Sequence, residues 1–172
     1  MRAVFFMVAS FISAALYAQP AFTLRGNSYV QRGILEYGGE EFPITAYVKH
    51  FKPSAETAVV VETQAGSLAK IVLDRNGSEI SLEASRAIPE RIVRKTILRD
   101  IRAVLGFYKL LGADVVRMSK DSRGVVATLD FDGYSIKFSD YKLRNGNRLL
   151  PHTIEICSDS YKLKLILASL GN

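Results

Sequence analysis

Residues 124–142 read Gly-Val-Val-Ala-Thr-Leu-Asp-Phe-Asp-Gly-Tyr-Ser-Ile-Lys-Phe-Ser-Asp-Tyr-Lys, and this stretch predicts two antiparallel strands joined by a tight turn. Apolar and polar residues alternate on both sides of Asp132-Gly133, and Tyr134, Ile136 and Phe138 share one face of the second strand. A period of two with one polar face is typical of a half-buried antiparallel strand. Asp-Gly supplies the positive φ angles that a short hairpin turn needs.

The same alternation extends to both sides of this hairpin. Tyr161, Leu163 and Leu165 oppose Lys162 and Lys164 in a later segment. Further turn dipeptides are Gly38-Gly39, Asn76-Gly77 and Asn145-Gly146. The pattern predicts about ten strands, at 28–37, 42–51, 56–63, 67–74, 77–83, 114–119, 124–131, 133–142, 151–157 and 160–167.

Two of these strands are apolar on both faces. In 42–51, Ile44 and Val48 share one face while Tyr47 and Phe51 share the other, and in 56–63 three valines follow one another at 59–61. A sheet with two apolar faces needs cover on both, or it encloses something apolar.

Segment 86–111 predicts one amphipathic helix between the two groups of strands. Its apolar residues recur at steps of three and four, at Val93, Ile97, Ile101, Val104, Leu105, Tyr108 and Leu111. Pro89 suits the start of a helix and Gly112 its end, and Gly106 can divide the segment into a helix and a short tail. The opposite face is basic, because the segment holds seven basic and two acidic residues, a net charge of +5. One helical block inside an antiparallel sheet predicts an α+β fold with the helix on one face.

The amino-acid composition excludes several classes of protein and of functional site. The 172 residues are 48% hydrophobic with a net charge of +6, which suits one folded domain and excludes an intrinsically disordered chain. The single cysteine excludes a disulfide framework and a cysteine-based zinc site, and the two histidines leave little for metal binding. His152 and Cys157 stand five residues apart in one predicted strand and so on opposite faces, which argues against a nucleophile–base pair. We expect Cys157 to be a buried small thiol.

Other candidate sites have simpler interpretations. His50 has no neighbouring ligand type, so an ordinary histidine is favoured over a metal ligand. Asp130 and Asp132 resemble the start of a calcium loop, but the later ligand positions are those of a strand, which favours a hairpin turn. We expect no catalytic residue, no metal and no cofactor, and the protein is expected not to be an enzyme.

Residues 1–18 have the pattern of a secretory signal peptide. Arg2 carries one positive charge, an apolar stretch follows from residue 3 to residue 16, and small residues lead to Ala18. The stretch is shorter than the roughly 20 residues of a membrane-spanning helix. Cleavage after Ala18 or Ala15 is compatible with the pattern, and no cysteine for lipid attachment lies near either position. We expect a periplasmic protein whose folded domain spans residues 19–172 with a net charge of +5.

Three stretches resemble one family when they are taken in order. Segment 28–37, Ser-Tyr-Val-Gln-Arg-Gly-Ile-Leu-Glu-Tyr, resembles the opening strand of the LolA/LolB superfamily, which carries lipoproteins to the bacterial outer membrane. Segment 97–101, Ile-Leu-Arg-Asp-Ile, is similar to a helix signature of an uncharacterised LolB-like domain family, and segment 150–167 resembles the closing hairpin. The resemblance implies an incomplete antiparallel β-barrel with a helical lid, inserted after the fifth strand, over an apolar cavity.

The sequence departs from that family at two places. LolB proteins are themselves lipoproteins, whereas this chain lacks the acylated cysteine, which makes it more similar to the soluble carrier LolA. LolB also projects a leucine, implicated in membrane insertion, from the loop after its third strand. Ala65 stands at the matching position of loop 64–68, and Leu68 follows three residues later.

The resulting hypothesis is an exported, monomeric carrier or receptor that binds lipoprotein acyl chains or another lipid in the cavity. The residues expected to line the cavity and lid are Ile44, Val48, Val60, Ile71, Ile97, Ile101, Tyr134, Ile136, Phe138 and Ile156. The residues expected to face an anionic membrane are Arg94, Lys95, Arg99 and Arg102, of which Arg94 and Arg102 are both expected to be exposed. A merely solvated basic face stays open as an alternative. Nucleic acid is disfavoured, because the chain is expected to be exported and lacks basic–aromatic stacking motifs.

The alternative function is a periplasmic interaction module with the same fold and a filled core. Such a module would bind a protein partner through the edge strands of its open sheet, whose backbone groups are unpaired.

Overall fold

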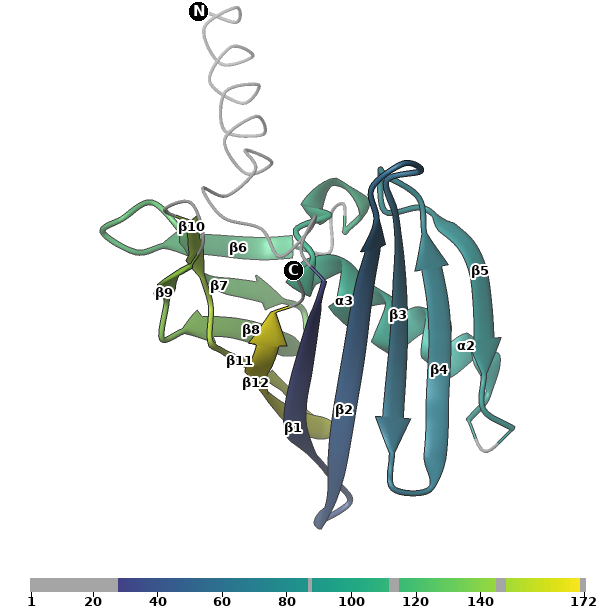
Figure 1. Ribbon diagram of the computed structural model, residues 1–172. Coiled ribbons are helices and arrows are strands. Elements are labelled where there is room, and N and C mark those ends of the chain that lie inside the picture. Colours follow the sequence, from purple (N-terminus) through teal and green to yellow (C-terminus); the bar gives the residue numbers. More distant parts are fainter. Residues whose placement is uncertain (1–27, 87, 112–114, 145–147, 171–172) are drawn as a thin grey trace, which may run out of the picture.

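Ten antiparallel strands form one open, curved sheet in the computed structural model, which describes residues 28–86, 88–111, 115–144 and 148–170 (Figure 1). The first five strands along the chain are β1 (Tyr29–Tyr37), β2 (Glu40–Phe51), β3 (Glu56–Thr63), β4 (Gly66–Leu73) and β5 (Glu79–Ala84). The others in this sheet are β6 (Val115–Lys120), β7 (Val126–Phe131), β8 (Tyr134–Ser139), β11 (Thr153–Ser158) and β12 (Tyr161–Leu170). Their spatial order is β5-β4-β3-β2-β1-β12-β11-β8-β7-β6, so β5 and β6 are the two edges.

The first and last strands of the chain join the two halves of the sheet. β1 pairs with β2 on one side and with β12 on the other, and Gly33 lies opposite Leu165. A Cβ atom at position 33 would stand 1.9 Å from the carbonyl oxygen of Lys164. Glycine in a strand interior often marks a tight bend where two backbones approach closely. Beyond this junction the sheet turns, so that β6, β7 and β8 run across the direction of β2–β5 (Figure 1).

Residues 90–111, here called the helical insert, connect the two edge strands. The helical insert consists of α2 (Glu90–Ile92), a π-helical turn η1 (Val93–Ile97), α3 (Leu98–Val104) and a 3-10 turn η2 (Tyr108–Leu110). Gly106 has a φ of +81°, which interrupts the helix and confirms the predicted division into helix and tail. Pro89 stands immediately before the first helical residue, as predicted, whereas Gly112 lies outside the described residues.

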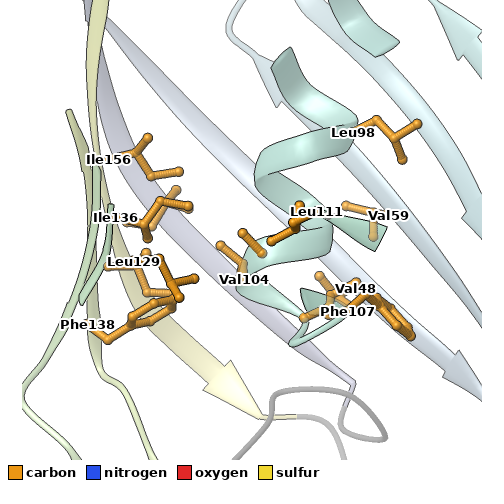
Figure 2. Packing of buried hydrophobic residues seen from close by; sticks show 14 of the residues in the cluster. Val48, Val59, Leu98, Val104, Phe107, Leu111, Leu129, Ile136, Phe138 and Ile156 are labelled. Atoms are coloured by element: carbon orange, nitrogen blue, oxygen red, sulfur yellow. The ribbon is translucent and has the colours of Figure 1, made fainter. Parts of the chain in front are cut away.

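The hydrophobic core lies between the concave face of the sheet and the helical insert. Leu129, Ile136 and Ile156 point toward the insert from one half of the sheet, and Val48 and Val59 approach it from the other (Figure 2). These side chains and those of the insert form one continuous buried cluster. The predicted α+β class and the incomplete antiparallel barrel with a helical lid after the fifth strand are therefore confirmed.

Two short strands were not predicted. β9 (Lys142–Arg144) and β10 (Arg148–Leu150) form a separate two-stranded sheet with only three residue pairs, too few for an alternating pattern to stand out. The predicted strand 133–142 ends earlier, because Asp140 has a φ of +54° and its carboxylate accepts a hydrogen bond of 2.8 Å from Thr153. The predicted turn at Asn145-Gly146 and the predicted signal peptide 1–18 lie outside the described residues.

Cys157 corrects one expectation. It is exposed rather than buried, because β11 alternates and Ile156 takes the buried position beside it. Cys157 faces the convex side of the sheet, where it pairs with Ser135 of β8 and Lys162 of β12.

Gly33→Ala is expected to lower the free energy of unfolding by on the order of 3 kcal/mol, because the new methyl group must push the β12 backbone away. Gly39→Ala is the matched control. Gly39 also belongs to the β1–β2 hairpin, but a Cβ there meets nothing within 4 Å, so only the strain of its positive φ is added. Urea unfolding of both variants measures the difference. Equal losses would show that the close approach at Gly33 contributes nothing to the sheet.

Candidate functional site

The candidate site is the apolar interior between the helical insert and the concave face of the sheet. Nine of the ten residues predicted to line it belong to the core cluster or pack against it. The buried ones are Ile44, Val48, Ile71, Tyr134, Ile136, Phe138 and Ile156. Ile97 and Ile101 of the helical insert are partly buried against the same cluster. The structure thus brings together residues from β2, β4, β8, β11 and the insert.

Val60 is the predicted residue that lies elsewhere. In β3, Val59 and Val61 are buried on the concave face, which places Val60 on the convex face. There it pairs with Tyr47 of β2 and Lys70 of β4. The three consecutive valines at 59–61 do not indicate which face of the strand is inner, because they make both faces apolar.

Several core residues at this site were missing from the predicted set. Phe107 is buried although it stands outside the helical stripe, and Leu129 of β7 is fully buried against the insert. A Cβ atom on Gly77 would stand 2.4 Å from the Phe107 ring, so this glycine makes room for the aromatic side chain. The Asn76-Gly77 dipeptide signalled a turn, but nothing in the sequence connected it to Phe107.

The β4–β5 turn also holds the helical insert by polar contacts. Arg102 donates a hydrogen bond of 3.0 Å from Nε to the carbonyl oxygen of Gly77. Arg94 forms ion pairs with Glu79 of β5 and with Glu90 one helical turn earlier. One side of the insert is therefore attached to the edge of the sheet that β5 forms.

Four side chains attach the other side of the insert to the opposite half of the sheet, and we call Arg99, Asp100, Tyr134 and Tyr161 the Asp100 cluster. The Tyr161 hydroxyl donates to Asp100 Oδ2 at 2.5 Å and accepts a hydrogen bond from Arg99 Nη2 at 3.2 Å. Arg99 Nε donates to Asp100 Oδ1 at 3.1 Å. The guanidinium lies over the Tyr134 ring, 3.6 Å from its centroid, a favourable cation–π geometry.

Burial and the charges within the Asp100 cluster together shift the pKa values of its members. Desolvation raises the pKa of the Asp100 carboxyl to about 6, although Arg99 and Tyr161 act in the opposite direction. Burial alone would lower the pKa of the Arg99 guanidinium, but Asp100 and the two tyrosines outweigh it, so the net change is upward and the side chain stays charged. Desolvation and the nearby Asp100 also raise the pKa of Tyr161.

The predicted basic face is divided by these contacts. Arg94 and Lys95 are exposed, whereas Arg99 and Arg102 are partly buried. The expectation that Arg94 and Arg102 are both exposed holds for Arg94 and is wrong for Arg102, because Arg102 turns toward the Gly77 carbonyl. A helical wheel places both arginines on one polar face but does not show the turn that approaches it.

In residues 28–86, 88–111, 115–144 and 148–170, no group of three or more His, Cys, Asp or Glu side chains could hold a metal ion. No helix in these ranges is both long and apolar enough to cross a membrane.

Two solved structures are similar to this chain. One is a domain assigned to an outer-membrane lipoprotein-sorting protein from Vibrio parahaemolyticus, with 8% identity, a TM-score of 0.48, and coverage of 96% of this chain and 90% of that one. The other is a DUF1329 family protein from Desulfovibrio piger, with 8% identity, a TM-score of 0.48, and coverage of 84% and 83%. No protein-family model and no curated protein matches this chain.

Asp100→Asn is expected to change how stability depends on pH. The pKa of Asp100 is about 6 in the folded protein and about 3.8 in the unfolded chain, so the folded state binds the proton more tightly. The stability that this proton contributes is fully present below about pH 4 and is lost as the pH rises through about 6. The parent should therefore lose on the order of 3 kcal/mol relative to Asp100→Asn between pH 4 and pH 7.5.

Chemical unfolding of parent and variant at these two pH values measures this change. A difference in unfolding free energy that stays constant over the interval would contradict the assigned environment of Asp100.

Proposed function

We propose that the protein is an exported carrier or receptor that holds an acyl chain between the concave face of its sheet and the helical insert. One observation carries the proposal: across the described residues, the concave face of an open sheet is apolar, and a single irregular helical segment covers it. Sites of this kind bind by apolar area and use few polar groups for orientation. Lipoprotein acyl chains and other lipids present such area.

An acyl chain would take the place of contacts that the helical insert now makes. The insert has features of a removable cover, because it contains a π-helical turn, a break at Gly106 and the partly buried residues Ile97 and Ile101. Its polar contacts with the sheet lie at Gly77 and Glu79 on one side and at Tyr161 on the other. Opening would break these polar contacts and expose the apolar side chains beneath the insert, while the β1–β12 junction stays paired.

Two further features support the cellular setting of this proposal. The signal-like segment 1–18 leads to export to the periplasm, with the folded domain in residues 19–172. Lys95 is exposed and forms no ion pair within the described residues, so it is available to an anionic membrane surface when a lipid is delivered. Titration with anionic vesicles tests this contact, which should weaken as salt is added.

Substitutions on the two faces of β4 test acyl binding. Ile71 is fully buried on the concave face, and its neighbour Val72 lies on the convex face. Ile71→Phe should weaken binding of a fluorescent fatty acid several-fold by filling interior space, whereas Val72→Phe should bind like the parent. Ile71→Ala enlarges the interior and should bind at least as tightly as the parent.

Native mass spectrometry of the protein purified from the periplasm gives an independent readout, in which bound lipid should appear as added mass. A lipid-free mass combined with no uptake of the fluorescent fatty acid would contradict the proposal.

The second candidate function is a module that binds a protein partner through a sheet edge. The observation that favours it is an exposed apolar side chain on each edge strand, Ile80 on β5 at 53% exposure and Val116 on β6 at 68%. Edge strands with such residues can pair with another chain. If Ile80→Lys or Val116→Lys removed a co-purifying protein while fatty-acid uptake was absent, this function would replace the first.

A further inference from the structure

The Asp100 cluster combines more polar and aromatic groups than a single contact between the helical insert and the sheet would need. It places a guanidinium, a carboxylate and a phenol hydroxyl at the joint between α3 and β12, with the aromatic ring of Tyr134 beneath the guanidinium. The Phe131 ring stacks on the Tyr134 ring, with centroids 4.1 Å apart, and both side chains belong to the buried apolar cluster. Polar recognition and apolar packing therefore meet at one place at the edge of the candidate site.

The Arg99 guanidinium is only partly used by its own chain. Its Nε and Nη2 atoms bond to Asp100 and Tyr161, while Nη1 has no hydrogen-bond partner within the described residues. The Arg99 side chain is 25% exposed, compared with 10% for Asp100. A planar guanidinium with donors in a fork is the side chain that best matches a carboxylate, and stacking on an aromatic ring orients it.

Asp100 now contacts the Arg99 guanidinium, and this position is unfavourable for its negative charge. Its carboxylate is buried, and desolvation raises its pKa despite the adjacent positive charge. The charged form of the carboxylate that now contacts Arg99 and Tyr161 is therefore less stable in this position than in water.

We propose that Arg99 and Tyr161 form the binding site for the carboxylate of a long-chain fatty acid, with Asp100 as the internal group that the ligand replaces. A carboxylate suits this site because the group already bound between these two side chains is a carboxylate. The acyl chain then runs from Tyr134 and Phe131 into the apolar interior. This inference rests on the proposed function and adds the chemistry of the ligand's polar end.

The test compares the binding of a fatty acid with that of its uncharged methyl ester. Binding of hexadecanoate and of methyl hexadecanoate is measured by displacement of a fluorescent fatty acid, for the parent and three variants. The parent should bind the acid about tenfold more tightly than the ester, because a charge-assisted hydrogen bond is lost with the ester. Arg99→Gln should bring the ratio of the two dissociation constants close to one, and Asp100→Asn should raise it, because the competing carboxylate is gone.

Arg91→Gln is the matched control, because Arg91 is an exposed arginine on the same helical insert with no contact to the Asp100 cluster. It should keep the ratio of the parent. Circular dichroism and thermal melting check that each variant is folded, and if Arg99→Gln does not fold, the parent and Asp100→Asn ratios decide.

The outcomes distinguish the proposed acyl binding from the proposed carboxylate site. If neither acid nor ester binds to the parent, the proposed function itself fails. If both bind to the parent equally well, or if Asp100→Asn leaves the ratio unchanged, acyl binding stands and the carboxylate site is wrong.

Discussion

The pairing of β1 with β12 around Gly33 is the constraint on which the rest of the structure depends. It joins the first and last strands and so turns two groups of strands into one sheet. The close approach at Gly33 lets this sheet curve, and the curvature creates a concave apolar face. Because β5 and β6 are then the two outer edges, the segment that connects them must cross from one edge to the other. The helical insert makes this crossing over the concave face and buries it.

The position of the helical insert is determined by polar contacts at its periphery as well as by apolar packing beneath it. Arg102 reaches the Gly77 carbonyl on the side of β5, and Asp100 reaches Tyr161 on the side of β12. Hydrogen bonds to charged groups such as these contribute about 1.5–3 kcal/mol each, but the desolvation of Arg102 and of Asp100 opposes that contribution. The polar contacts therefore orient the insert more than they stabilise it, and the apolar cluster supplies most of the favourable free energy. Such a balance suits a cover that is specific in position and can open.

Alternation and turn residues were sufficient to predict the ten strands of the main sheet and the place of the helix. Tyr134, Ile136 and Phe138 show a local period of two, and Gly106 is a local break, so no knowledge of distant neighbours was needed. The face of Val60 and the exposure of Cys157 depend on which side of the sheet the insert covers, and that is a tertiary property. The Asp100 cluster could not be predicted from the sequence for the same reason. The sequence pattern places Arg99 and Asp100 on a helix. It does not show their partner Tyr161, because Tyr161 is separated from Asp100 by 61 residues in the sequence.

Native-state hydrogen exchange of the helical insert, with and without hexadecanoate, tests most directly whether this segment is a cover over a stable sheet. The account predicts that the amides of α3 exchange through a local opening of lower free energy than the opening that exposes the amides of β1 and β12. It also predicts that saturating hexadecanoate changes the protection of α3 and leaves that of the β1–β12 pair unaltered. If α3 exchanged only together with β1 and β12, and the fatty acid had no effect on either, the helical insert would be a fixed part of the core.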